Sequence, residues 1–240
     1  MIVEVCANSL ESALNAQLAG AHRIELCSEL PSGGITASYG LIKKVREALS
    51  IPVHVLIRPR SGDFFYSDME FQTMLEDIAI CTSLGVDGIV SGVLNPDWSV
   101  DWDRTKALFK AAGNCSFTFH RAFDLVANPL ETFDKLQEMG VDALLTSGQA
   151  ASAMEGLSLL KQLEKKSNTC TIMPGAGITD NNAIHFKQAG FKAIHLSATK
   201  KILNTTALPR IPMNAAMGIA ENEVLVTDPD ILKKVIKSVN

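Results

Sequence analysis

The sequence predicts an α/β fold, a single (β/α)8 TIM-type barrel with a long irregular segment before the last helix. The chain has 240 residues, 47% of them hydrophobic and 20% charged, which is enough to bury a sizeable core. A helix–glycine–strand junction recurs four times, at spacings of 65, 55 and 50 residues. Because one strand–helix unit takes about 30 residues, each interval has room for a further strand, giving eight in all.

Each junction has the same local form, in which a helix ends, a glycine follows, and an apolar run begins. The glycines are Gly20, Gly85, Gly140 and Gly190, and glycine suits the left-handed position after a helix. The four intervening strands are predicted at residues 2–6, 53–58, 115–120 and 170–173. Amphipathic stretches such as 70–84 supply the helices. A doubly wound open sheet is the alternative, but its usual Gly-x-Gly-x-x-Gly after the first strand is absent here.

One segment departs from this alternation. Residues 202–228 contain Pro209, Pro212 and Gly218 and precede a last amphipathic helix that ends at Val239. Loops longer than about 15 residues are usually functional or interaction elements. We therefore expect one domain over residues 1–240, with 202–228 either forming an interface or covering the mouth of the barrel.

Composition excludes several classes of function. The net charge is −4, and no basic stretch offers a footprint for nucleic acid. No apolar run reaches the roughly 18 residues that a membrane span needs. The five cysteines are odd in number and contain no Cys-x-x-Cys, which predicts reduced thiols in a cytoplasmic protein. No Walker or dinucleotide motif indicates a nucleotide cofactor.

The first two strands end in the same Glu-x-Cys pattern. Glu4 and Cys6 end the first, and Glu25 and Cys27 end the second. Working residues of such barrels lie at the carboxyl ends of the strands, and neighbouring strands are about 4.8 Å apart. Cys6 and Cys27 are therefore expected side by side, as a pair of thiolates that suits Cu(I). The alternative is that both are small buried hydrophobic residues.

Charged residues follow other strands at the same end of the barrel. Arg58 and Arg60 follow the third strand, and His120 and Arg121 follow the fifth. Glu4, Glu25 and His120 are candidates for acid–base catalysis. The arginines are the expected counter-ions of the two glutamates, and a purely structural salt-bridge network is an equal alternative.

The loop after the seventh strand carries two glycines. Gly175 and Gly177 let the backbone approach a ligand, and Ser147 after the sixth strand adds a hydroxyl on the same side. TIM barrels often bind phosphate after strands seven and eight. Together with Arg58, Arg60 and Arg121 this predicts an anion site, although a tight turn would use the same glycines.

Several of these segments resemble the CutC copper-homeostasis family. They are Glu4–Cys6, Gly20–Cys27, Gly33–Thr36, Ile57–Phe64, Phe119–Asp124, Leu145–Gly148 and Met173–Gly177. The resemblance covers about residues 1–200. It implies a cytoplasmic barrel protein associated with copper tolerance that binds Cu(I) through Cys6 and Cys27.

Two functions therefore remain open. The first is copper homeostasis with Cu(I) bound by Cys6 and Cys27. The second is an enzyme acting on a small anionic or phosphorylated metabolite, with copper binding incidental. The expected partners are a small ion or small anionic ligand and a second copy of the chain in a homo-oligomer, with neither nucleic acid nor membrane.

Overall fold

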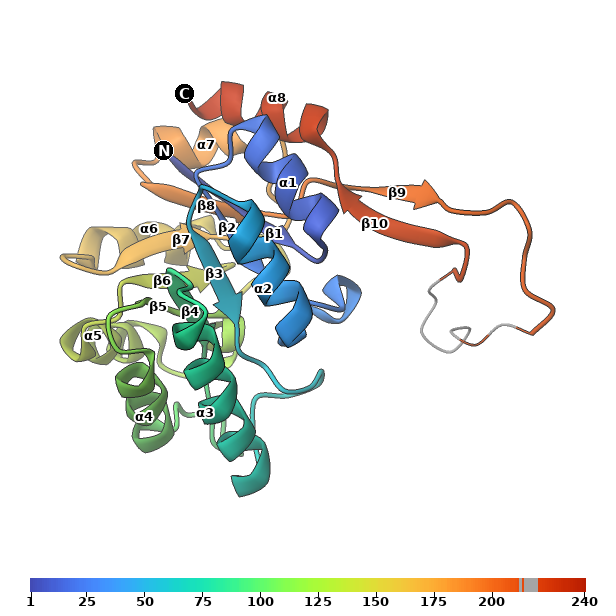
Figure 1. Cartoon of the computed structure of the whole chain (residues 1–240). Helices are drawn as coiled ribbons and strands as arrows, with labels where there is room; N and C mark the ends of the chain where they lie inside the picture. Colours follow the sequence, from blue (N-terminus) through green and yellow to red (C-terminus); the bar gives the residue numbers. More distant parts are fainter. Residues whose placement is uncertain (212, 214–219) are drawn as a thin grey trace.

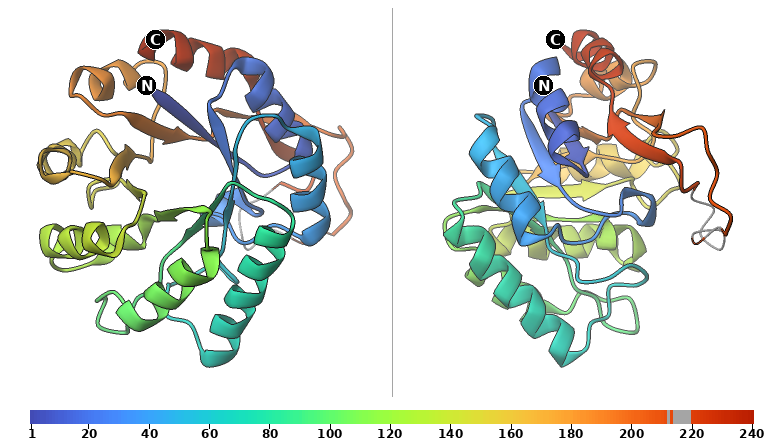
Figure 2. Two further views of the ribbon diagram at one scale, coloured as in Figure 1. Left: turned by 60° about the vertical axis from the view of Figure 1, so that its left-hand side comes forward. Right: turned by 45° about the vertical axis from the view of Figure 1, so that its right-hand side comes forward.

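The computed structural model describes residues 1–211, 213 and 220–240. Eight parallel strands form one sheet in the order β7-β6-β5-β4-β3-β2-β1-β8, and β7 packs beside β8, so the barrel is nearly closed (Figure 2). This confirms the predicted (β/α)8 barrel. The strands are β1 Ile2–Ala7, β2 Arg23–Leu26, β3 Val53–Leu56, β4 Gly88–Ser91, β5 Ser116–Phe119, β6 Ala143–Thr146, β7 Thr171–Pro174 and β8 Ala193–Leu196.

Helices surround these strands as an outer ring (Figure 2). They are α1 Leu10–Ala19, α2 Tyr39–Ala48, α3 Asp68–Ser83, α4 Trp102–Ala112, α5 Pro129–Met139, α6 Leu157–Lys166, α7 Ala183–Gln188 and α8 Pro229–Val239, with short 3₁₀ turns η1 Leu30–Ser32 and η2 Arg121–Leu125. The helix predicted over 70–84 begins slightly earlier, because Ser67 and Glu70 form a capping box at the start of α3.

The glycine junctions fold as predicted. Gly20 ends α1 at φ 93° and Gly140 ends α5 at φ 92°, both in the left-handed region, which glycine adopts without a steric penalty. The barrel strands are buried on both faces. Between strands and helices lies an apolar core that includes Phe117, Phe133 and Phe186, whereas inward side chains, including those of Glu4 and His54, fill the barrel.

The segment 202–228 begins and ends in a two-stranded β ribbon. β9 Thr199–Leu203 pairs antiparallel with β10 Glu223–Thr227, and this ribbon extends away from the barrel (Figure 1). Pro212 and Gly218, which helped to predict a loop, lie outside the described residues. Among the described residues none of 199–228 lines the central cavity. That segment 202–228 forms an interface or covers the mouth of the barrel stays a prediction. No helix in the described ranges is long and apolar enough to cross a membrane.

Candidate functional site

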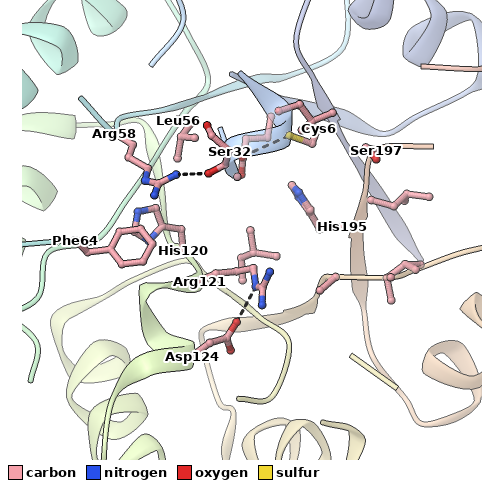
Figure 3. A pocket seen from close by; sticks show the side chains of 18 of the residues that line it. Cys6, Ser32, Leu56, Arg58, Phe64, His120, Arg121, Asp124, His195 and Ser197 are labelled. Atoms are coloured by element: carbon pink, nitrogen blue, oxygen red, sulfur yellow. Dashed lines mark hydrogen bonds and ion pairs between the residues drawn. The ribbon is translucent and has the colours of Figure 1, made fainter. Parts of the chain in front are cut away.

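A cavity of about 500 Å³ lies at the carboxyl ends of the barrel strands (Figure 3). Most strands contribute to its wall, either with one of their last two residues or with the loop that follows. Its polar and charged lining residues are Cys6, Glu25, Ser32, Arg58, His120, Arg121, Asp124, His195 and Ser197. The parallel topology places these residues together, since it brings all the strand ends to one face.

Cys6 and Cys27 meet at one side of this cavity. Their Sγ atoms are 3.4 Å apart, both side chains are buried, and both are free thiols. The predicted adjacency is thus confirmed. The other cysteines lie elsewhere, since Cys81 is inside α3 and Cys115 and Cys170 directly precede β5 and β7.

Glu25 and His195 complete a cluster around Cys6. The three residues offer one ligand atom each, and these atoms lie within 4.8 Å of one another. The hydrogen bond with Cys27, followed by burial and the nearby carboxylates, raises the pKa of the Cys6 thiol. Burial raises the pKa of Glu25 to about 7. Near neutral pH the Cys6 thiol of the metal-free cluster is therefore protonated, whereas Glu25 is close to the midpoint of its titration.

Glu4 orients His195 from inside the barrel. Burial alone would raise the pKa of Glu4, but the hydrogen bond from His195 and the charge of Arg23 bring it down to about 2. Glu4 is therefore a carboxylate, and the 2.7 Å contact from its Oε1 makes His195 Nδ1 the hydrogen-bond donor. The same contact and the charge of Glu25 outweigh burial and raise the pKa of His195. Its Nε2 remains for a metal or a proton.

Arg23 and His195 were not among the predicted site residues. Arg23 Nε donates to Glu4 Oε2 at 2.5 Å, so the prediction that Arg58, Arg60 or Arg121 would neutralise Glu4 is wrong. The register explains the pairing, because Glu4 lies opposite Arg23 on β2 and opposite His195 on β8. Parity could have found Arg23, which is two residues before the inward-facing Glu25.

The opposite wall holds Arg58, His120 and Arg121. The Arg58 guanidinium donates to the backbone carbonyls of Ser32, Gly34 and Gly62 at 2.7–3.1 Å. Burial and the charge of Arg58 lower the pKa of His120 to about 3, so its imidazole is neutral. Because His120 Nδ1 accepts from the Ala122 N–H, its proton resides on Nε2. The catalytic role of His120 stays a prediction. The neutral imidazole can donate a hydrogen bond from Nε2.

Three of the predicted anion ligands, Arg60, Ser147 and Gly175, do not line the cavity. Arg60 does not line the cavity, because Glu70 and Asp63 bind its guanidinium at 2.6 and 3.0 Å outside it. The Ser147 hydroxyl accepts a hydrogen bond from Arg121 and donates one to Asp124, so it stabilises the Arg121–Asp124 ion pair.

Gly175 does not line the cavity, and a Cβ there would lie 2.6 Å from Leu145 Cδ1. Ala176 and Gly177 from the same loop do line the cavity. Of the predicted anion site, the wall of the cavity therefore contains Arg58, Arg121 and Gly177.

The comparisons with known proteins agree with this architecture. The CutC family model matches residues 1–200. A CutC protein of Enterobacter sp. is 49% identical over 199 residues, covering 83% of this chain and 81% of the relative. One from Salmonella agona is 48% identical over 197 residues, covering 82% and 79%. A Streptococcus agalactiae structure described as a copper homeostasis protein, CutC, superposes with a TM-score of 0.78 at 32% identity, covering 82% of this chain and 98% of that one. The chain belongs to the CutC family.

Proposed function

We propose that this protein acts in copper homeostasis in the cytoplasm and binds Cu(I) in the barrel cavity through Cys6, Cys27 and His195. The observation that carries the proposal is the pair of free, buried sulfurs 3.4 Å apart. Thiolate and imidazole are the ligands that select a soft monovalent copper ion. The description of the Streptococcus agalactiae relative supports the same assignment.

The spacing of the sulfurs favours a third ligand. With a metal–thiolate bond of about 2.3 Å, two sulfurs 3.4 Å apart subtend an angle of about 95° at the metal. That angle is far from the linear arrangement of two ligands and leaves one side of the ion open. His195 belongs to the cluster around Cys6, and its Nδ1 is already bound by Glu4. Its Nε2 is therefore the best-placed nitrogen to complete the coordination.

Charge also suits a monovalent ion. Cu(I) with two thiolates has a net charge of −1, and its binding releases the two thiol protons. Glu25 is only partly ionised near neutral pH, because burial raises its pKa to about 7. The ionised Glu4 is already paired with Arg23. The buried cluster thus avoids an accumulation of unpaired negative charge, which would be costly in the barrel.

The test is an anaerobic competition between the protein and a chromogenic Cu(I) chelator. We expect Cys6→Ser and Cys27→Ser each to weaken Cu(I) binding at least about 100-fold, and His195→Gln to weaken it about 10- to 100-fold. Cys115→Ser is the matched control, because its thiol donates to the Val86 carbonyl at the other end of the barrel and should leave the affinity unchanged.

An unchanged affinity in the Cys6→Ser, Cys27→Ser double variant would contradict the proposal. If His195→Gln binds Cu(I) as tightly as the wild type does while the cysteine variants bind it more weakly, Cys6 and Cys27 are ligands and the third ligand is a group other than His195.

A further inference from the structure

The cavity is larger than a copper site requires. Its volume of about 500 Å³ lies within the range of about 300–1,000 Å³ that is typical of small-molecule sites. Cys6 and His195 occupy one side of it, and Arg58, Phe64 and His120 gather on the other, with Arg121 and Asp124 beside them (Figure 3). The second side has no role in the proposed copper site.

Arg58 is a buried cation that has no counter-ion in the part of the chain that the structure describes. Its side chain is 5% exposed, and among the described residues its guanidinium binds backbone carbonyls and no carboxylate. Asp124 lies close to His120 in the sequence, but its carboxylate is already paired with Arg121 at 2.8 Å. It also accepts hydrogen bonds from the Ser147 N–H and hydroxyl. Buried charges are costly unless they are paired, so this wall has an excess of positive charge.

Hydrogen-bond donors without acceptors gather at the same wall. Within the described residues, Arg58 Nε and His120 Nε2 are buried and have no partner. The Phe64 ring covers both side chains, at 4.9 Å from Arg58 Cζ and with its centroid 4.8 Å from that of His120. Closer to the opening are Arg121, whose side chain is 46% exposed, and the loop with Ala176 and Gly177. An entering anion meets these two groups first.

We infer that this wall binds the oxyanion group of a small organic metabolite, a carboxylate or a phosphate, with Arg121 and the 176–177 loop contacting the anion and Arg58 supplying the compensating charge. The rest of the ligand extends towards Glu25 and His195. Glu25 Oε2 is a third buried atom without a partner in the described part of the chain, and it accepts a hydrogen bond from a hydroxyl or amino group of the ligand there. The oxyanion-binding wall shares no residue with the proposed copper ligands, so binding of the anion does not require copper.

The experiment measures thermal unfolding of the metal-free protein in inorganic phosphate, in succinate and in chloride at matched ionic strength. Binding to the native state raises the melting temperature by mass action, so we expect phosphate or succinate to raise it more than chloride does. The anion with the larger effect distinguishes a phosphate-bearing from a carboxylate-bearing ligand. Arg58→Gln and Arg121→Gln should weaken the apparent affinity for that anion at least about 10-fold.

Arg60→Gln is the matched control. Its guanidinium is two residues from Arg58 but is bound by Glu70 and Asp63 outside the cavity, so the variant should keep the full response to the anion. If Arg58→Gln does not fold, Arg121→Gln decides, because its side chain is partly exposed and its loss creates no buried hole. The inference is overturned if neither phosphate nor succinate exceeds chloride with the wild type. It is also overturned if all three variants respond as the wild type does.

Discussion

The Glu25 carboxyl makes the stability of the metal-free protein depend on pH. Burial raises its pKa from 4.5 to about 7, so between these values the folded state retains a proton that the unfolded state has released. The contribution of Glu25 to stability is therefore greatest below pH 4.5 and falls as the pH rises towards 7. At 1.36 kcal/mol per pH unit the loss is about 3 kcal/mol. Glu25→Gln cannot release this proton and should not show that loss.

Urea unfolding of both proteins, metal-free and with the thiols reduced, measures the effect. The free energy of unfolding of Glu25→Gln minus that of wild type should be about 3 kcal/mol larger at pH 7.5 than at pH 4.5. A difference that is the same at both pH values would show that Glu25 ionises as an ordinary exposed carboxyl does.

At the same scale, the sequence located single residues but not all of their partners. Glu4, Glu25, Cys6 and Cys27 could be placed from strand parity alone, because side-chain direction alternates along a strand. That His195 binds Glu4 depends on the register between β1 and β8, the first and last strands of the barrel. No local pattern specifies that register.

At the scale of the elements, the turn that carries Gly34 packs against Cys27 and keeps its sulfur close to that of Cys6. Gly34 has φ +85°, and a Cβ at this position would lie 2.8 Å from Leu56 Cδ2 and 3.2 Å from Cys27 Cβ. Gly34→Ala should therefore displace Cys27, destabilise the fold by about 1–3 kcal/mol, and weaken Cu(I) binding in the competition assay. Gly190→Ala is the matched control, since Gly190 has φ +93° and open space around it.

The control separates backbone strain from crowding. Gly190→Ala should cost about 1 kcal/mol for its left-handed conformation and leave the affinity for Cu(I) unchanged. If the two variants bind Cu(I) equally well, the turn does not position the thiols.

Element prediction succeeded where the chain repeats and failed where it does not. Four glycine junctions of one form made the eight-stranded count secure, since each specifies a helix end and a strand start. β9 and β10 have no such junction, and β9 carries two lysines, Lys200 and Lys201, that face solvent and pair with acidic residues. Their pairing joins residues twenty or more positions apart, which local sequence patterns do not encode.

For the whole molecule, the ribbon of β9 and β10 provides a physical basis for the predicted homo-oligomer. It extends from the barrel (Figure 1), and apolar side chains on it and on the chain beyond β9 are exposed, among them Leu208 at 74%, Ile211 at 77% and Met213 at 88%. Apolar groups gathered on a projecting segment are typical of association surfaces. A symmetric dimer, the commonest soluble assembly, would bury them.

Sedimentation velocity at micromolar concentration tests this association. We expect wild-type protein to sediment as a dimer of the 25.9 kDa chain, and a Leu208→Asp, Ile211→Asp double variant to sediment as a monomer, because charged groups are costly to bury at an apolar contact. Leu18→Asp is the control, since Leu18 is equally exposed, at 73%, but lies on α1 of the barrel. A wild-type protein that remains monomeric would exclude the dimer. A dimer that persists in the double variant would place the interface on the barrel and away from the ribbon.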